Sequence, residues 1–131
     1  MSVDPLFLDV HDVMALHAAQ LEVFGGGNGM RELGLLESAV AQPQASFDGH
    51  FVHEGLLAMA GAYLFHIVSN HPFVDGNKRA GVLAALVFLD VNGMAIDHPS
   101  EALYALTMRV AEGSIPKAAV VTELERIAVS R

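Results

Sequence analysis

Two long apolar segments, separated by a short polar loop, set the strongest limit on the fold of this chain. Residues 54–69 and 77–91 both have helical composition, and each is apolar on nearly every face of the helix it would form. A helix that is apolar all round must be covered on all sides, because it would otherwise expose that surface to water. We therefore expect these two helices at the centre of the molecule.

Four further segments with helical patterns would cover the central pair. They are residues 10–24, 31–41, 101–112 and 116–129. Asp9 and Ser100 are suitable caps for the first and third of these, and the glycine-rich run 25–29 predicts a flexible connector. Residues 44–52 are polar and contain glycine, which indicates an exposed loop or a small hairpin near the site. The pattern predicts a single all-α domain of six helices over residues 1–131.

Composition excludes several classes of function. The net charge is −8, which disfavours direct nucleic-acid binding. The longest apolar run, residues 82–89, is much shorter than the roughly 20 residues that span a membrane. The chain has no cysteine and starts without a basic signal segment, so we expect a cytoplasmic protein. Hydrophobic residues make up 53% of the chain, an excess that fits an apolar groove for a partner.

The loop between the two central helices places charged and polar side chains in a row. It reads His-Pro-Phe-Val-Asp-Gly-Asn-Lys-Arg from residue 71 to residue 79. The first turn of the helix that begins at Asn77 offers free backbone N–H groups, and these attract anions. Gly76 would let a phosphate approach the backbone, while Lys78 and Arg79 lie where cations destabilise a helix unless an anion is bound. The pattern predicts a phosphate site, with two solvated surface cations as the alternative.

Other residues of the loop suit catalysis and metal binding. His71 precedes Pro72 in a rigid segment, where it could act as a general base towards a hydroxyl group. Asp75 offers the hard oxygen ligand that Mg²⁺ prefers, although it could also cap the helix that follows. We expect Phe73 to anchor the loop, and Asn77 to orient His71 or to bind a phosphate oxygen.

Residues 71–79 resemble the signature of the Fic/Doc family, H-x-F-x-[D/E]-G-N-[G/K]-R, at each of its specified positions. The resemblance extends over nearly the whole chain. It is carried by Gly25-Gly26, Gly29-Met30-Arg31, residues 35–39, Pro43-Gln44 and residues 86–93, which are similar to the death-on-curing (Doc) group. It implies a compact six-helix Fic/Doc core with a short flap near residues 44–53.

Two departures from the common motif bear on the reaction. Most members of the family transfer AMP from ATP to a protein hydroxyl, and their motif continues G-N-G-R-x-x-R. Lys78 and Val82 stand here in place of the third residue of that motif and its second Arg. Both differences match the Doc group. The resemblance therefore implies a toxin that uses ATP and Mg²⁺ to phosphorylate a target such as elongation factor Tu.

In this interpretation His71 is the base and Asp75 holds Mg²⁺. The nucleotide and its phosphates would be bound by Phe73, Gly76, Asn77, Lys78 and Arg79. AMP transfer to a protein hydroxyl is the first alternative. A catalytically silent module with the same fold is the second.

Control of the activity is expected to come from another chain. Many Fic proteins carry an inhibitory helix with the motif [S/T]-x-x-x-E-[G/N]. Glu54 and Glu112 are each followed by Gly, but His50 and Met108 stand four residues before them instead of Ser or Thr. The resemblance then implies a Phd-like antitoxin as partner, bound in an apolar groove.

Overall fold

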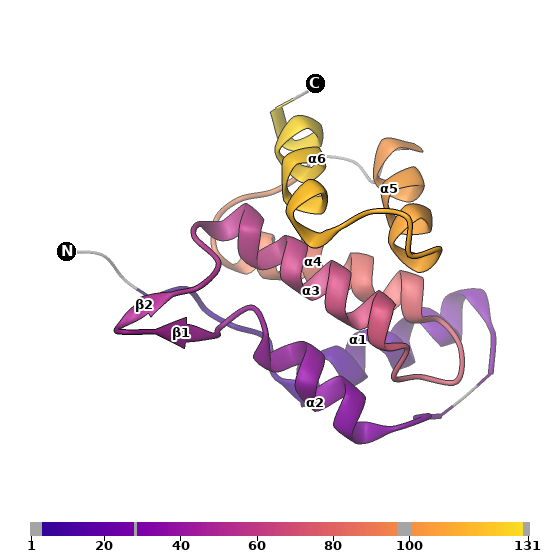
Figure 1. Ribbon diagram of the computed structural model, residues 1–131. Helices are drawn as coiled ribbons and strands as arrows, with labels where there is room; N and C mark the ends of the chain where they lie inside the picture. Colours follow the sequence, from indigo (N-terminus) through magenta and orange to yellow (C-terminus); the bar gives the residue numbers. More distant parts are fainter. Residues whose placement is uncertain (1–3, 28, 97–100, 130–131) are drawn as a thin grey trace.

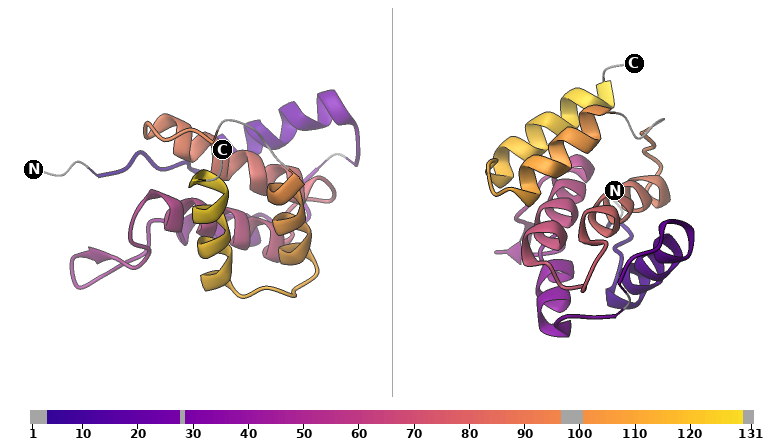
Figure 2. Two further views of the ribbon diagram at one scale, coloured as in Figure 1. Left: turned by 90° about the horizontal axis from the view of Figure 1, so that it is seen from above. Right: turned by 90° about the vertical axis from the view of Figure 1, so that its right-hand side faces the viewer.

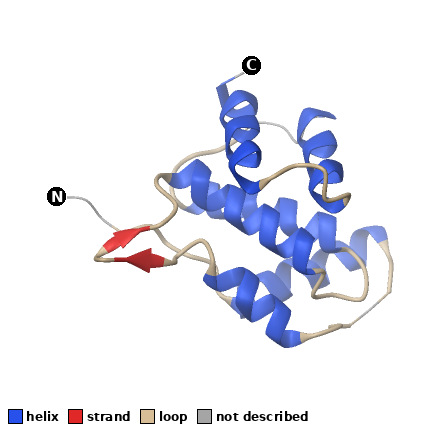
Figure 3. Cartoon of the chain, in the orientation of Figure 1, coloured by secondary structure: helices blue, strands red, loops and turns tan. Residues whose placement is uncertain are grey.

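The computed structural model describes residues 4–27, 29–96 and 101–129, which form six helices and one two-stranded hairpin (Figure 1, Figure 3). In chain order the elements are α1 Val10–Phe24, α2 Leu33–Ala41, β1 Ser46–Phe47, β2 His50–Phe51, α3 Leu56–Asn70, α4 Asn77–Val91, α5 Glu101–Ala111 and α6 Lys117–Val129. The prediction of an all-α core with a small hairpin is confirmed. Ser100, predicted to cap α5, lies outside the described residues.

Helices α3 and α4 form the middle of three layers (Figure 2). Helices α1 and α2 pack on one side of this pair, and α5 and α6 pack on the other. Every residue of α3 from Met59 to Leu64 is buried, so no face of this part of the helix is open. Helix α4 is buried along a stripe from Ala80 to Leu89, whereas Leu86 on its outer side is only partly buried. The expected central position is confirmed, with α3 more deeply enclosed than α4.

The two central helices approach each other closely at Gly81 of α4. A Cβ atom at this position would lie 2.7 Å from Cγ2 of Val68 and 3.4 Å from the carbonyl oxygen of Leu64, both on α3. Val68 is buried and branched at Cβ, so its methyl group has little freedom to move away. The separation of the helices therefore requires glycine at position 81.

The starts of the first two helices differ in how they are held. Asp9 caps α1 in a capping box. Its side chain accepts a hydrogen bond from the N–H of Asp12, and the side chain of Asp12 accepts one from the N–H of Asp9. Helix α2 starts at Leu33, two residues later than predicted. The N–H groups of Arg31 and Glu32 donate to the carbonyl of Pro72 instead, at 2.7 and 3.0 Å. Because residues 31 and 32 contact the loop after α3, helix α2 begins only at Leu33.

The hairpin β1–β2 lies at the far end of the central pair from the polar loop (Figure 1). The hairpin precedes α3, and the polar loop follows α3. The two ends of a straight helix of 15 residues lie about 22 Å apart. Phe51 of the hairpin contacts Phe7, which stacks on Phe88 near the end of α4, with ring centroids 5.5 and 5.8 Å apart. The hairpin is therefore not adjacent to residues 71–76, in contrast to the expected flap.

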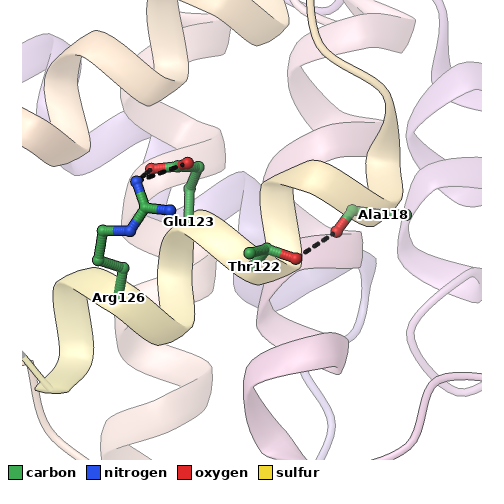
Figure 4. A network of polar contacts seen from close by, with 4 residues as sticks. All are labelled: Ala118, Thr122, Glu123 and Arg126. Carbon is green, nitrogen blue, oxygen red and sulfur yellow. Dashed lines mark hydrogen bonds and ion pairs between the residues drawn. The ribbon is translucent and has the colours of Figure 1, made fainter.

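Helix α6 carries polar contacts along its exposed surface. Figure 4 shows the Thr122 hydroxyl, which donates to the carbonyl of Ala118 at 3.3 Å, and the ion pair of Arg126 with Glu123 at 3.0 Å. Such pairs at exposed positions stabilise a helix by only about 0.3–0.5 kcal/mol. Among the described helices, none has the length and apolar character needed to cross a membrane.

A group of basic side chains joins α3, α6 and the segment after the hairpin. Nζ of Lys117 donates to Nε2 of His66 at 3.0 Å, since an ammonium group has no lone pair to offer. Burial lowers the pKa of His66 to about 4, and the charges of Lys117 and His53 act in the same direction. Burial also lowers the pKa of His53. Both histidines are therefore neutral at pH 7.

The free energy of unfolding should fall as the pH is lowered from 6.5 towards about 4, the unfolded and folded pKa values of His66. In this interval the unfolded chain binds a proton at His66 that the folded chain does not bind, so protonation favours unfolding. Denaturant titrations across the interval would measure the loss. His66→Gln keeps an acceptor for Lys117 but cannot titrate, and should reduce the slope; equal slopes would contradict the assignment. Asp9 and Asp75 lose their contribution only at lower pH, because their pKa values are lowered from 3.8.

Gly81→Ala should be less stable than Gly34→Ala by about 1–3 kcal/mol, the usual cost of overpacking a core. Both changes gain helix propensity, but a Cβ atom at Gly34 of α2 meets nothing within 4 Å, whereas one at Gly81 meets Val68. Thermal and urea unfolding of the two variants would measure the difference. Equal stabilities would show that the α3–α4 contact has room for a methyl group.

Candidate functional site

The polar loop between α3 and α4 starts from a strained backbone. His71 ends α3 in the left-handed conformation, with φ 54° and ψ 53°, and its N–H donates to the carbonyl of Ile67 at 3.2 Å. A non-glycine residue in this region costs on the order of 1–3 kcal/mol and persists only where its surroundings hold it. The contacts around the loop must therefore supply that restraint.

Residues 29–32 provide one side of the restraint. Nε of Arg31 donates to the carbonyl of His71 at 2.7 Å, and Nη2 donates to that of Asn70 at 3.0 Å. A cation at the carboxyl end of a helix is favourable, because the last carbonyls are unpaired and carry partial negative charge. Val74 donates its N–H to the carbonyl of Gly29, and Met30 pairs with Phe73 in an isolated bridge. The loop is thus held along the backbone as well as at the helix end.

Phe73 anchors the loop in the core, as predicted. Its ring is 2% exposed and lies against the ring of His17 on α1, with centroids 3.7 Å apart and planes 5° from parallel. Nε2 of His17 in turn donates to the carbonyl of Asp75 at 2.7 Å. Because the ring is covered, Phe73 can serve a nucleotide site only by fixing the loop that forms it.

Asn77, the first residue of α4, joins the two halves of the loop through its side chain. Its Oδ1 accepts from the N–H of Phe73 at 2.9 Å, and its Nδ2 donates to the carbonyl of Phe73 at 3.0 Å. Nδ2 also lies 3.1 Å from Nδ1 of His71. The amide is 5% exposed. Of the two roles considered for Asn77, the structure places its side chain on His71.

The contact between Asn77 and His71 has a consequence for the tautomer of the imidazole. The bond to the N–H of Phe73 fixes which end of the amide is oxygen, so the end that faces His71 is the NH₂ group. An NH₂ group can only donate, and Nδ1 of His71 must accept. In the neutral ring the proton then resides on Nε2. The ring of His71 is otherwise exposed to solvent.

The Asp75 carboxylate lies at the surface and is held by backbone N–H groups. Oδ2 accepts from Gly27 at 3.2 Å and Oδ1 from Gly76 at 2.8 Å. These bonds lower the pKa of Asp75, and the charges of Lys78 and Arg79 lower it further. The carboxylate is therefore ionised at neutral pH. The N-cap of α4 is Gly76, without a side-chain cap bond, so Asp75 is free of that alternative role.

A single exposed carboxylate fits Mg²⁺ that takes its other ligands from phosphates and water. No three His, Cys, Asp or Glu side chains come together as a metal site in the described part of the chain. The donor set thus suits a metal that arrives with a nucleotide. It does not suit a metal held by protein ligands alone.

Gly76 is required by packing as well as by its conformation. Its φ is +80°, and a Cβ atom would overlap the side-chain amide of Gln20 on α1 and lie 3.4 Å from Cδ2 of His17. Gln20 is 3% exposed, and neither of its amide atoms has a hydrogen-bond partner. The α1 helix therefore presses directly on the turn that starts α4.

The two cations of the first turn of α4 are both exposed, but they differ in their contacts. The guanidinium carbon of Arg79 lies 4.2 Å from the centroid of the Phe24 ring at the end of α1. Lys78 contributes to the charge around Asp75. His71, Asp75 and both cations thus lie around the start of one helix, as the sequence suggested.

The sequence did not indicate the residues that hold this arrangement from α1 and residues 27–31. They are His17, Gln20, Phe24, Gly27 and Arg31. His17 and Gln20 share the buried stripe of α1 with Val13, a spacing visible in the sequence. The partners of His17 and Gln20 lie more than 50 residues away in the chain. No local pattern identifies such pairs.

Comparison with known proteins agrees with the motif. The Fic/DOC family model matches residues 7–89. "Toxin Doc" of Mycolicibacterium smegmatis is 40% identical over 90 residues, which cover 69% of this chain and 67% of that protein. "Protein kinase doc" of Escherichia phage P1 is 32% identical over 116 residues, 88% of this chain and 90% of that protein.

Replacing Asn77 by Asp should move the neutral His71 proton from Nε2 to Nδ1, because a carboxylate accepts where the amide donates. The ¹⁵N chemical shifts of the ring nitrogens report the tautomer directly. His17 is an internal control, since its Nε2 donates to the carbonyl of Asp75 in both proteins. A wild-type His71 with its proton on Nδ1 would contradict the hydrogen-bond assignment.

Proposed function

The chain belongs to the Fic/Doc family, and from this premise we propose that it is a Doc-like toxin that transfers the γ-phosphoryl group of ATP to a hydroxyl of a target protein. The observation that carries the proposal is the set of groups at the start of α4. An exposed histidine, an ionised carboxylate and two cations surround the free N–H groups of one helix terminus. One relative bears the name of a protein kinase and the other that of a toxin.

The start of α4 offers a seat for the transferred phosphoryl group. The first N–H groups of a helix have no partner within the helix, and its dipole favours negative charge there. Lys78 and Arg79 add two positive charges in the same turn. Phosphoryl transfer depends mainly on such positioning and charge stabilisation.

His71 would take the proton of the attacking hydroxyl. In the proposed step the hydroxyl oxygen forms a bond to the γ-phosphorus, the bond to the bridging oxygen breaks, and ADP leaves with that electron pair. The hydroxyl proton passes to the imidazole of His71. Such a base accelerates a reaction typically about 10²–10⁴-fold.

The tautomer of His71 adds a requirement to this step. Nε2 can accept a proton only when the ring carries its proton on Nδ1. That form cannot keep the Asn77 contact, because two N–H groups would face each other. The imidazole must therefore turn away from Asn77 before transfer.

Asp75 would hold Mg²⁺ against the phosphates of ATP. The metal would neutralise charge on the phosphates and orient them. The hydrogen bonds from Gly27 and Gly76 keep the carboxylate ionised and fix its direction. Gly76, the backbone N–H of Asn77, Lys78 and Arg79 would complete the phosphate-binding set, with Phe73 as their buried support.

Two residues favour the kinase over AMP transfer. Lys78 adds an exposed, flexible cation where the common motif has glycine. Val82, the residue in place of the second Arg, is apolar and partly buried against the core, so it has no charge for a phosphate. AMP transfer, with the same base and the α-phosphorus as the point of attack, remains the second candidate on the strength of the shared motif.

The partners follow from the same proposal. The target would be a cytoplasmic protein such as elongation factor Tu, whose phosphorylation would arrest translation. A Phd-like antitoxin would bind apolar surface of the toxin. An open pocket of about 250 Å³ beside the end of α4, lined by Leu86, Val87, Asp90, Ala95 and Ile96, is a suitable place.

Label from γ-³²P-ATP, and not from α-³²P-ATP, should appear on purified elongation factor Tu or on a protein of whole lysate. His71→Ala should reduce this transfer at least about 100-fold, the loss of a general base. His11→Ala, an exposed histidine on α1, is the matched control and should keep full transfer. Addition of the protein encoded next to this chain should suppress the label if it is the antitoxin.

The other outcomes are equally specific. Label from the α position alone would make the protein an AMP transferase despite Lys78 and Val82. Label from neither nucleotide would favour a binding module that has the fold but not the reaction.

A further inference from the structure

Phe24 is an aromatic residue that lies outside the hydrophobic core. It is the last residue of α1, and 61% of its surface is exposed. Its ring contacts Arg79, whose guanidinium carbon lies 4.2 Å from the ring centroid. Arg79 itself is exposed as well. The two side chains therefore order each other at the surface.

We propose that Phe24 is a positioning residue of the phosphoryl-transfer site, where its ring holds the guanidinium of Arg79 ready for the phosphates of the nucleotide. The inference rests on the proposed function and adds to it a residue outside the family motif. Phe24 acts through Arg79 and is not assigned any contact with the reacting atoms.

The geometry of a guanidinium suits this role. An aromatic ring binds the flat face of the group through the cation–π attraction. The N–H donors point outwards in the plane of the group, so stacking leaves them free for a bidentate contact with phosphate oxygens. A ring thus restrains Arg79 without occupying the donors that a phosphate needs.

A carboxylate in the same place would act differently. It would neutralise Arg79 and compete with the phosphate for its N–H groups. Within the described residues, the ion pair of the structure is Arg126 with Glu123 on α6, and Arg79 has none. The oxygens of Asp75 accept from Gly27 and Gly76 instead. Arg79 therefore contacts an aromatic face and, within the described residues, no carboxylate forms an ion pair with it.

The position of Arg79 makes such a support necessary. Its place in the first turn of α4 exposes it to the positive end of the helix dipole, which repels a cation. A free arginine side chain also has many rotamers, and ordering them on binding reduces affinity. The ring of Phe24 attracts the cation and limits its rotamers before a nucleotide arrives.

The same short segment also holds the other charged group of the site. The N–H of Gly27, three residues after Phe24, donates to Oδ2 of Asp75. The end of α1 and the residues after it therefore contact both the cation and the carboxylate. Distortion of this segment would shift the two groups together.

A double-mutant cycle on Phe24 and Arg79 tests the inference through the affinity for Mg·ATP, measured by isothermal titration calorimetry. Phe24→Leu keeps an apolar side chain without a π face, and should raise Kd about two- to fivefold, the usual strength of an exposed cation–π pair. Phe24→Tyr keeps the π face and should bind as the wild type does. In an Arg79→Gln background, Phe24→Leu should have no further effect. Val23→Ala, at an exposed position next in the helix, is the control for general loss of apolar surface.

Two results would overturn the inference. An unchanged Kd for Phe24→Leu would show that the ring does not position Arg79. An equal loss with and without Arg79 would show that Phe24 acts by another route. Both leave the proposed function intact, provided that the wild type binds Mg·ATP and transfers its γ-phosphoryl group. Failure of the wild type to bind Mg·ATP would overturn the function and the inference together.

Discussion

A single buried amide determines how the central helices meet at the site. Asn77 binds both backbone groups of Phe73 and faces His71, so it closes the turn between α3 and α4 with one side chain. A buried amide left without partners costs about 1–3 kcal/mol, and one with all its partners makes the arrangement unique. The strained backbone of His71, the buried ring of Phe73 and the direction of the imidazole all depend on this closure.

Charge at the start of α4 opposes the stability of the helix. Two cations lie at the positive end of the helix, and a buried glutamine beside Gly76 has no partner. The fold tolerates these costs because other contacts hold the rest of the turn. They include the stacked rings of His17 and Phe73 and the bonds from Arg31 to the end of α3.

The class of fold and the position of the site could both be predicted from the sequence, for different reasons. The central position of helices α3 and α4 was predictable, because helices that are apolar on nearly every face must be covered on all sides. The site was predictable because the motif lies in the loop that joins them. The start of α2 was not, since the N–H groups of Arg31 and Glu32 donate to the carbonyl of Pro72 and the helix begins only after them. The hairpin was expected beside the site, but it lies at the opposite end of α3. The length of α3 sets the distance between the hairpin and the site. The contacts of His17 and Phe24 join residues distant in the chain, and no local pattern reports them.

The contacts of residues 27–31 with the polar loop have a consequence for the order of folding. Helices α3 and α4 are neighbours in the chain and close a loop of only six residues, so their pairing has low contact order. The bonds of Gly27 and Arg31 close loops of 48 and 40 residues, and pay a larger entropy of closure. The helical pair is therefore a natural nucleus, and the geometry of the candidate site is completed only when the amino-terminal third of the chain docks. Mutations in that third would speed unfolding more than they slow folding.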